Sequence, residues 1–308
     1  MVIRELPPTH VQESARSGDS SRAATVARHL VRLPCLVILE ARIPILIVFA
    51  LRVVVASQLS TRFSASSALL VVSWLALTIS AYVYNGITDL DADRENGSRR
   101  PLASGRMSVS SARATAVVLA ATGLAGCWYL APCEGLLACA SLILGWTYSG
   151  GPQLKRFPVA CGVIVTAASA LTYSAGACMT RTGVGTYVVY ALWSAWVGFA
   201  SPVKDLSDVH GDSLDGRRTL PVRLGLAAAS RRMAVMIVAW SAILLTVARW
   251  VAPALEQATW VAALGSVTVA AYLMRVSAHQ SRTQLRRPYR TLMFTQFAVN
   301  ATILACLT

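Results

Sequence analysis

Acidic side chains are concentrated in two short segments of this chain, residues 89–95 and 205–215. Only 14 of the 308 residues are Asp or Glu. Eight of them lie in these segments, namely Asp89, Asp91, Asp93 and Glu95, and Asp205, Asp208, Asp212 and Asp215. Carboxylates this close together repel one another, and a bound cation removes that repulsion. The two segments therefore predict cation binding.

The spacing of the acids predicts a row of oxygen ligands on one helical face in each segment. Side chains three or four residues apart lie above one another on an α-helix. The first acidic row, with residues four apart, is Asn85, Asp89 and Asp93. The second acidic row, with spacings of three and four, is Asp205, Asp208 and Asp212.

The ligand type favours a hard metal ion. Oxygen ligands without His or Cys at metal-binding spacing suit Mg²⁺, which proteins usually bind through a few carboxylates together with substrate phosphate and water. The alternative is that these are solvated loop acids, but two matched rows that each follow an apolar segment favour metal binding. The predicted ligands are Asp89, Asp93, Asp205, Asp208 and Asp212.

Basic residues follow or precede both rows. The chain has only two lysines, Lys155 in YSGGPQLKR and Lys204 directly before the second row. GSRRPL follows the first row and DGRRTLP follows the second, a weak repeat roughly 118 residues apart. Cations beside acidic rows suit a metal–polyphosphate complex, whose non-bridging oxygens they bind. Lys155 and Arg100 are candidates for that role, whereas for most arginines we prefer anchoring of the membrane topology.

The rest of the chain is apolar enough to be a membrane protein. Hydrophobic residues make up 55% and charged residues 14% of the sequence, and the mean hydropathy is +0.56. A soluble domain has about 25% charged residues, and a bilayer-spanning helix needs about 20 apolar ones. We interpret nine segments as spans: residues 36–55, 65–84, 112–131, 133–148, 159–178, 187–203, 234–251, 259–274 and 291–307.

The distribution of basic residues predicts the orientation of these spans. Of the 28 Lys and Arg residues, 23 lie in the N-terminal arm and alternate loops, three lie in the opposite loops, and Arg42 and Arg52 lie within the first span. The positive-inside rule then places the N-terminus and the acidic rows in the cytoplasm and the C-terminus on the opposite side. The same distribution accounts for the net charge of +14 through contact with anionic lipid, so we expect no nucleic-acid partner.

Two domains are expected. Residues 1–33 are polar and of mixed charge, which is typical of a disordered arm, and they lack the apolar centre of a secretory signal. Residues 34–308 form the membrane domain. Its seven cysteines form no C-x-x-C pair, and we interpret them as small core hydrophobes.

The two rows and their flanks resemble a known family. N-x-x-x-D-x-x-x-D at 85–93, followed by N-G-x-R-R-P-L-A-S-G, is similar to the first signature of UbiA-type intramembrane prenyltransferases. D-x-x-D-x-x-x-D at 205–212 is similar to the second, and the segments 148–155 and 216–225 match the family's tyrosine-to-lysine loop and its T-L-P-V-x-L-G element. One departure is Gly86, where many members with aromatic substrates have Asp.

The resemblance implies an all-α integral membrane protein with nine transmembrane helices around a central cavity capped by cytoplasmic loops. An isoprenyl diphosphate would lie with its tail among the helices and its head at the cytoplasmic mouth, where Mg²⁺ bridges it to the five aspartates. The residues expected to bind the diphosphate are Asn85, Lys155, Arg100, Arg42 and Tyr148. Arg42 is included because a charge within a span usually faces a cavity; snorkelling to the surface is the alternative.

Three functions are consistent with these features. The first is transfer of the prenyl group to an acceptor, expected to be an aromatic ring. The second is cyclisation of the isoprenyl diphosphate without an acceptor, which the Gly86 departure favours. The third is ion-coupled transport, against which the acids lie at one membrane face rather than at the midplane.

Overall fold

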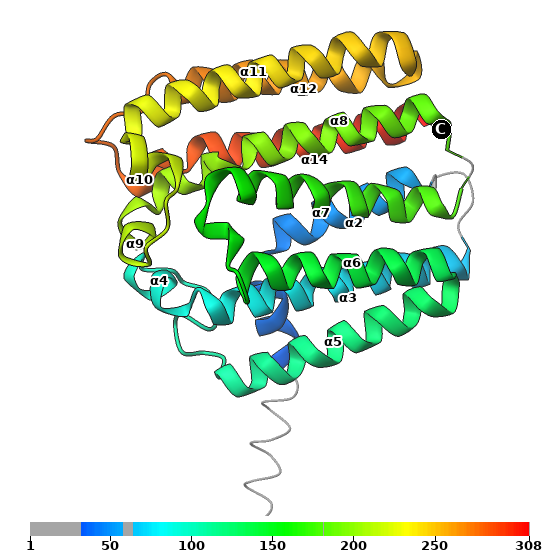
Figure 1. Cartoon of the computed structure of the whole chain (residues 1–308), viewed down its shortest axis with the longest axis horizontal. Helices are drawn as coiled ribbons and strands as arrows, with labels where there is room; N and C mark the ends of the chain where they lie inside the picture. The colour runs from blue at the N-terminus through cyan, green and yellow to red at the C-terminus, as the bar shows by residue number, and fades with distance from the viewer. Residues whose placement is uncertain (1–31, 58–63, 181, 308) are drawn as a thin grey trace, which may run out of the picture.

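The computed structural model describes residues 32–57, 64–180 and 182–307, and these residues form helices joined by short loops, with no strand among them. Long helices run back and forth across the molecule (Figure 1). Their bounds are α2 (Ile43–Ala56), α3 (Ala65–Thr88), α5 (Val109–Leu130), α6 (Pro132–Ser149), α7 (Pro158–Cys178), α8 (Val184–Ala200), α11 (Leu226–Val251), α12 (Glu256–Leu273) and α14 (Arg287–Leu307).

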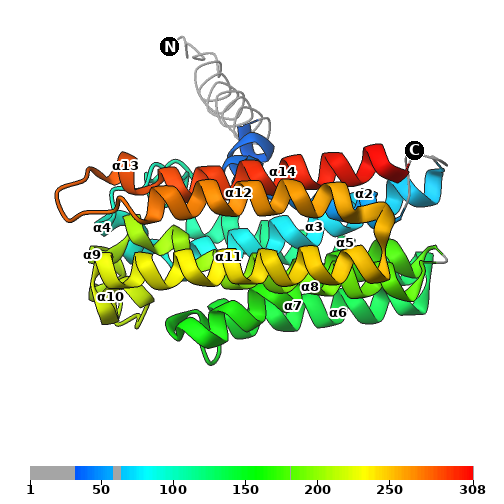
Figure 2. The same cartoon turned by 90° about the horizontal axis from the view of Figure 1, so that it is seen from above.

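Short helices connect the long ones. The α-helices α4, α9, α10 and α13 gather at one end of the bundle, opposite the end where the C-terminus lies (Figure 2). The short elements are α4 (Leu90–Glu95), η1 (Leu154–Arg156), η2 (Ser201–Ser207), α9 (Val209–Leu214), α10 (Leu220–Leu224), η3 (Pro253–Leu255) and α13 (Arg282–Leu285).

The long helices have the length and apolar surface of a multi-pass membrane protein. The predicted spans lie in helical parts of the described residues. Four of the described helices are individually long and apolar enough to cross a membrane, or five if a bent pair counts as one span. Large apolar side chains such as Val72, Val117 and Leu264 are mostly exposed on the outside of the bundle, where lipid can contact them. The number of nine crossings and the central cavity remain predictions.

The predicted span over residues 36–55 is not one continuous helix. The structure has two helices, Arg32–Glu40 and α2, which are bent by 79° relative to each other. Arg42 lies at the break with a φ angle of 65°, and Pro44 follows in the first turn of α2. Proline lacks the N–H that would continue the preceding helix, so a break on its N-terminal side is expected physically. Arg42 therefore lies at a bend, not within a helix.

Residues of the predicted N-terminal arm lie almost entirely outside the described residues. Only Arg32 and Leu33 are described, and both belong to the Arg32–Glu40 helix. The prediction that the rest of this arm is disordered is not tested.

The largest core cluster joins α8 to the helices around it. Trp193 and Trp196 are almost fully buried and pack against side chains of α11 such as Met233 and Ile237. The indole Nε1 of Trp196 donates to Ser266 Oγ on α12 at 3.0 Å, which satisfies its one polar group. Burial of large side chains of this kind, at about 1.5–3 kcal/mol each, fixes α8 and the acidic segment that follows it.

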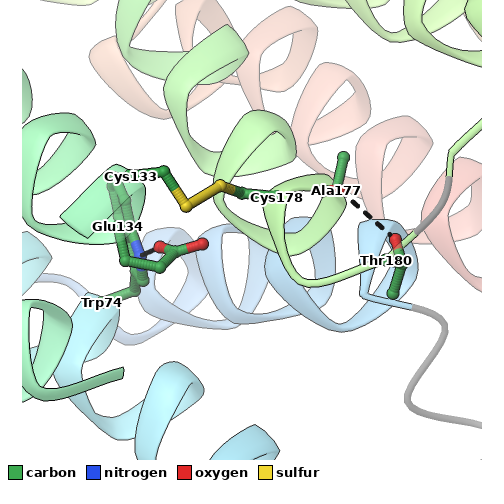
Figure 3. The surroundings of a disulfide bond; sticks show 6 residues. All are labelled: Trp74, Cys133, Glu134, Ala177, Cys178 and Thr180. Carbon is green, nitrogen blue, oxygen red and sulfur yellow. Dashed lines mark hydrogen bonds between the residues drawn. A yellow bond between two sulfur atoms is a disulfide. The ribbon is translucent and has the colours of Figure 1, made fainter. Parts of the chain in front are cut away.

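Two cysteines form a disulfide, which corrects their interpretation as core hydrophobes. Cys133 in the first turn of α6 is bonded to Cys178 at the end of α7, beside Glu134 and Trp74 (Figure 3). The helices are antiparallel, so these two turns meet although 45 residues separate them in sequence. Hydropathy alone could not reveal that contact. The bond lies at the end of the bundle opposite α4 and α9.

Candidate functional site

The two acidic segments fold in the same way. The first passes from α3 through Asp89 into the six-residue helix α4, and the second passes from η2 through Asp208 into the six-residue helix α9. Each short helix is followed by a glycine with positive φ, Gly97 at 60° and Gly216 at 69°. Equivalent residues of the two segments are 119 positions apart in the chain. This holds for Asp89 and Asp208, for Asp93 and Asp212, and for the two glycines. The weak sequence repeat is therefore a structural repeat.

This arrangement corrects the prediction that each row lies along one continuous helix. Asp89 and Asp208 are the junction residues, with ψ angles of 6° and 15° that interrupt the regular helix. Asp205 lies in the 3₁₀ helix η2 and Asp212 in α9. The spacing of three and four residues was read as one α-helix because a local change of backbone conformation leaves the sequence periodicity unchanged.

The two segments lie side by side at the same end of the bundle (Figure 1). Asn96, the residue that follows α4, accepts a hydrogen bond from the backbone N–H of Gly211 in α9 at 3.2 Å. A Cβ atom on Gly211 would lie 2.2 Å from the Asn96 side chain, so the two helices are in close contact. The convergence expected of the two acidic segments is present.

Asp89 is the most heavily paired carboxylate of the first row. Its Oδ1 accepts from Lys155 Nζ at 2.5 Å and from Arg217 Nη2, and its Oδ2 accepts from Asn85 Nδ2 at 2.8 Å. Burial alone would raise the pKa of Asp89, but the adjacent Arg217 and Lys155 outweigh that effect and hold the pKa below its usual value. Asp89 is therefore ionised at neutral pH.

Asn85 and Lys155 occupy the positions expected from the sequence. Asn85 Oδ1 accepts from Ser149 Oγ at 2.8 Å, which orients its amide nitrogen towards Asp89. Lys155 is 5% exposed and also donates to Thr88 Oγ1 at 2.9 Å. Lys155 lies in η1, and Gln153, the residue before η1, has a left-handed backbone conformation with φ 49°. The only described lysine beside the first row thus points directly at it.

Arg217 joins the two segments, and sequence reasoning missed it. Besides Asp89 it contacts Asp215 Oδ2 at 2.8 Å and Asp212 Oδ1 at 3.6 Å. Arg217 belongs to the Arg-Arg pair of the repeat, and the sequence favours membrane anchoring for most arginines without distinguishing this one. The clue in the sequence was the position of Arg217 directly after the second row. The other member of the pair, Arg218, is exposed.

The carboxylates of the second row differ in their surroundings. Asp208 is paired with Arg282 at 2.6 Å and with Arg286 at 3.6 Å, both near α13 and far along the chain. Asp205 has no ion pair with any described residue, and burial raises its pKa to about 6. Burial, together with repulsion from Asp205, raises the pKa of Asp212 to about 7. Both acids therefore hold a proton more readily than an ordinary carboxyl, because the neighbouring cations only partly offset the effect of burial.

Arg100 lies beside the first row, as expected. Its Nη1 contacts Asp93 Oδ2 at 2.6 Å, and its Nη2 contacts Glu40 Oε1 at 2.7 Å. Glu40 was not among the residues singled out from the sequence, because nothing in the sequence indicates that the end of the Arg32–Glu40 helix meets this loop.

Arg42 and Tyr148 lie near the rows but do not contact them directly. The Arg42 guanidinium makes no hydrogen bond or ion pair with a described residue, yet it is within electrostatic range of Asp93 and Asp208. The Tyr148 hydroxyl accepts from Lys204 Nζ at 2.9 Å, and that ammonium lies 5.6 Å from the centre of the Tyr148 ring. Arg42 is therefore unpaired among the described residues but within electrostatic range of both rows, whereas Tyr148 contacts Lys204.

The donor set fits a hard divalent cation bound together with an anionic ligand. All candidate ligands are oxygens, and the raised pKa values of Asp205 and Asp212 reflect negative charge that a metal ion would stabilise. Among the described residues, however, these carboxylates do not form a closed cluster within 4.8 Å of one another. Guanidinium and ammonium groups lie between them. The site thus combines carboxylates for metal ions with cations for phosphate oxygens.

Comparison with known proteins finds a matching family and several relatives. Residues 43–298 match the model of the UbiA prenyltransferase family. Digeranylgeranylglyceryl phosphate synthase of Sulfolobus acidocaldarius is 32% identical over 158 residues, which are 51% of this chain and 56% of the relative. Homogentisate phytyltransferase of Synechocystis is 29% identical over 167 residues, 50% of this chain and 54% of the relative. The chain spans about half the length of the curated relatives it matches.

Solved structures share the fold. A UbiA homologue from Archaeoglobus fulgidus bound to DMAPP and Mg²⁺ has a TM-score of 0.70 at 18% identity, covering 88% of this chain and 97% of that chain. A UbiA homologue from Aeropyrum pernix K1 has a TM-score of 0.61 at 21% identity, covering 84% and 96%. At these identities the likeness establishes the fold.

Proposed function

Because the chain belongs to the UbiA prenyltransferase family, we propose that it is a Mg²⁺-dependent intramembrane prenyltransferase, which ionises an isoprenyl diphosphate and transfers the prenyl group to an acceptor. The observation that carries this proposal is the position of Arg217 between Asp89 of the first segment and Asp212 of the second. One guanidinium contacts both acidic segments, so the segments lie close enough for metal ions bound to each of them to hold one diphosphate.

The aspartates of the two rows would hold the metal ions, and those ions would neutralise the diphosphate as it leaves. The proposed ligands are Asp89, Asp93, Asp205, Asp208 and Asp212. Four of these carboxylates contact a basic side chain, so metal binding requires that the basic groups exchange partners. The phosphate oxygens are the natural new partners.

Lys155 and Arg217 are proposed to make that exchange. Both now donate to Oδ1 of Asp89. When Asp89 turns to a metal ion, their N–H groups are free to donate to non-bridging oxygens of the diphosphate. Asn85 donates its amide N–H at the same point, and the hydroxyl of Ser149 keeps that amide oriented.

Arg42 is proposed to bind the diphosphate from the other side of the mouth. The bend between Glu40 and Ile43 turns this residue out of the helix, and its guanidinium lacks a carboxylate partner among the described residues. An anionic ligand between the rows would supply one. Arg100 is placed to support the same anion, although two carboxylates hold it in this structure.

The reaction then breaks the C1–O bond of the isoprenyl diphosphate, and the electron pair leaves with the diphosphate. The allylic cation bonds to a nucleophilic atom of the acceptor, which loses a proton. Apolar helices exclude water from the cation until transfer. Tyr82, whose main-chain oxygen accepts from Arg100 Nη2 at 3.3 Å and whose ring packs at 84° to Phe49, is proposed to stabilise the positive charge with its ring. The Tyr148 ring already lies beside the Lys204 ammonium, which leaves it less suited to that role.

The acceptor was expected to be aromatic. Homogentisate phytyltransferase is named for an aromatic acid, whereas digeranylgeranylglyceryl phosphate synthase is named for a glyceryl phosphate. An acceptor panel must therefore contain both classes. The proposed orientation places the acidic rows and the short helices around them in the cytoplasm, following the positive-inside rule.

The test uses purified protein in detergent with Mg²⁺ and isoprenyl diphosphates of five to twenty carbons, such as DMAPP and GPP. We expect Mg²⁺-dependent release of diphosphate and, with the right acceptor, a product heavier by one prenyl group in mass spectrometry. Release with a hydrocarbon product and no acceptor would instead identify a terpene cyclase. No release at any chain length, together with ion flux in liposomes, would contradict the proposal and favour a transporter.

A further inference from the structure

A buried carboxylate that belongs to neither acidic row lies beside the first one. Glu40 is the last residue of the first helix, and its side chain is 0% exposed. Its Oε1 lies 2.7 Å from Arg100 Nη2, and its Oε2 accepts from the backbone N–H of Leu102 at 3.0 Å. Arg100 also donates to the main-chain oxygen of Glu40 at 3.0 Å. Glu40 therefore fixes both the guanidinium of Arg100 and the loop that carries it.

The other nitrogen of the same guanidinium contacts the first acidic row. Arg100 Nη1 lies 2.6 Å from Asp93 Oδ2, so Arg100 is held between Asp93 and Glu40. A guanidinium with Asp93 as its only partner would compete strongly with a metal ion for that carboxylate, because charge-assisted contacts are about twice as strong as neutral ones. The carboxylate of Glu40 attracts the same guanidinium, so Arg100 holds Asp93 less strongly and competes less with a metal ion.

The backbone of α3 leaves room for a carboxylate at this point. A Cβ atom built on Gly86 would lie 2.2 Å from Glu40 Oε1 and 2.8 Å from Arg100 Nη2. A side chain at position 86 therefore requires the end of Glu40 and the guanidinium of Arg100 to move. The same volume can hold the end of Glu40 or a short side chain from position 86, but not both.

From these contacts we propose that Glu40 is a positioning residue of the metal–diphosphate site. It acts through Arg100. Glu40 orients the guanidinium and partly neutralises its charge, so that Asp93 can exchange Arg100 for a metal ion. Glu40 itself touches neither the metal nor the substrate, and its role rests on the proposed function of the acidic rows. The helix bend at Arg42 is held by the same contacts, because Arg100 donates to the main chain of Glu40 two residues before it.

Metal binding without turnover tests this role. Purified protein in detergent is titrated with Mn²⁺ in the presence of inorganic pyrophosphate, and bound Mn²⁺ is measured by electron paramagnetic resonance. Glu40→Gln keeps the shape of the side chain and removes its charge, so we expect the Mn²⁺ dissociation constant to rise at least about tenfold. Glu95→Gln is the matched control, since Glu95 is an exposed acid on α4 without an ion pair to a described residue, and it should bind as the wild type does.

A relocated carboxylate separates positioning from general stability. Gly86→Asp alone should weaken Mn²⁺ binding, because its side chain collides with Glu40, and Glu40→Ala alone should weaken it through loss of the charge. In the double variant Glu40→Ala/Gly86→Asp, the new carboxylate can reach Arg100 from α3. We expect this variant to bind Mn²⁺ several-fold more tightly than either single variant.

Two results would overturn the proposal: wild-type Mn²⁺ affinity in Glu40→Gln, or a double variant that binds no better than the single ones. Circular dichroism and size-exclusion profiles identify variants that fail to fold, and Glu40→Gln, which keeps every steric contact, decides the question if Glu40→Ala does not fold. Failure of the proposed function is recognised separately, because it would show as absence of diphosphate release by the wild type.

Discussion

Arg217 donates its Nη2 N–H to the carboxylate of Asp89, although 128 positions separate the two residues in the chain. The same guanidinium contacts Asp212 and Asp215 on its own side. Two acidic segments from distant parts of the chain are thereby joined at one end of a helical bundle. The proposed catalytic site depends on this junction.

The junction predicts a large effect of Arg217→Gln on turnover. Glutamine keeps a hydrogen-bond donor but removes the charge that faces Asp89 and, in the proposed reaction, the diphosphate. Loss of one such electrostatic contact typically costs about a hundredfold in rate, and diphosphate release should fall by about that factor. Arg218→Gln is the control, because Arg218 is the exposed neighbour in the same Arg-Arg pair. Equal rates for the two variants would remove Arg217 from the site.

The metal-ligand assignment predicts that Asp89→Ala and Asp208→Ala each abolish turnover while the protein stays folded in detergent. Each substitution removes an oxygen ligand, and the bundle does not depend on it because neither residue lies in an apolar core cluster. Diphosphate release and size-exclusion chromatography are the measurements. Asp91→Ala serves as control, since Asp91 is 98% exposed and pairs only with Arg94 among the described residues. A rate near that of the wild type in either test variant would contradict its assignment.

The raised pKa values of Asp205 and Asp212 predict a pH dependence of metal binding. Burial raises these pKa values to about 6 and about 7, so below pH 6 both carboxyls carry protons that a metal ion must displace. The Mn²⁺ affinity should therefore increase as the pH rises from 5.5 to 7.5 and level off above. Asp205→Asn removes one titrating carboxyl and also the repulsion that raises the pKa of Asp212, so the remaining dependence should be weaker and shifted to lower pH. An affinity that is constant across the range would show that neither acid binds the metal.

The disulfide predicts a stability difference between oxidised and reduced protein. It closes a loop of 45 residues between α6 and α7, for which chain entropy gives a stabilisation of about 2–4 kcal/mol. Dithiothreitol should lower the thermal midpoint of the wild type but leave Cys133→Ser unaffected. Cys35→Ser should respond like the wild type, because Cys35 is a free, exposed thiol. A midpoint unchanged by reduction, or no linked peptide in mass spectrometry, would argue against the bond.

Some of this structure could be predicted from the sequence, because it depends on local patterns. Apolar runs predicted the long helices, and four-residue spacing brought Asn85 next to Asp89 within one turn. Lys155 was identified because lysine is rare in this chain and its loop has a distinctive composition. These features are visible in short stretches of residues.

Other features could not be predicted because they depend on contacts between distant segments. Arg217 and Arg282 look like topology anchors until the fold places them on Asp89 and Asp208. The contact of Glu40 with Arg100 beside Gly86 is visible only in the folded chain, where the Arg32–Glu40 helix ends against α3. Periodicity likewise gave no warning that Asp89 and Asp208 interrupt their helices, because a break in backbone conformation does not alter residue spacing.

The most direct measurement of the central claim is a structure of the protein with Mn²⁺ and an isoprenyl thiolodiphosphate, using anomalous scattering to locate the metal. The account predicts metal ions at the diphosphate, bound by Asp89 or Asp93 on one side and by Asp208 or Asp212 on the other, with Lys155 and Arg217 moved onto phosphate oxygens. Metal ions bound to one segment alone, or a diphosphate bound elsewhere in the bundle, would contradict it.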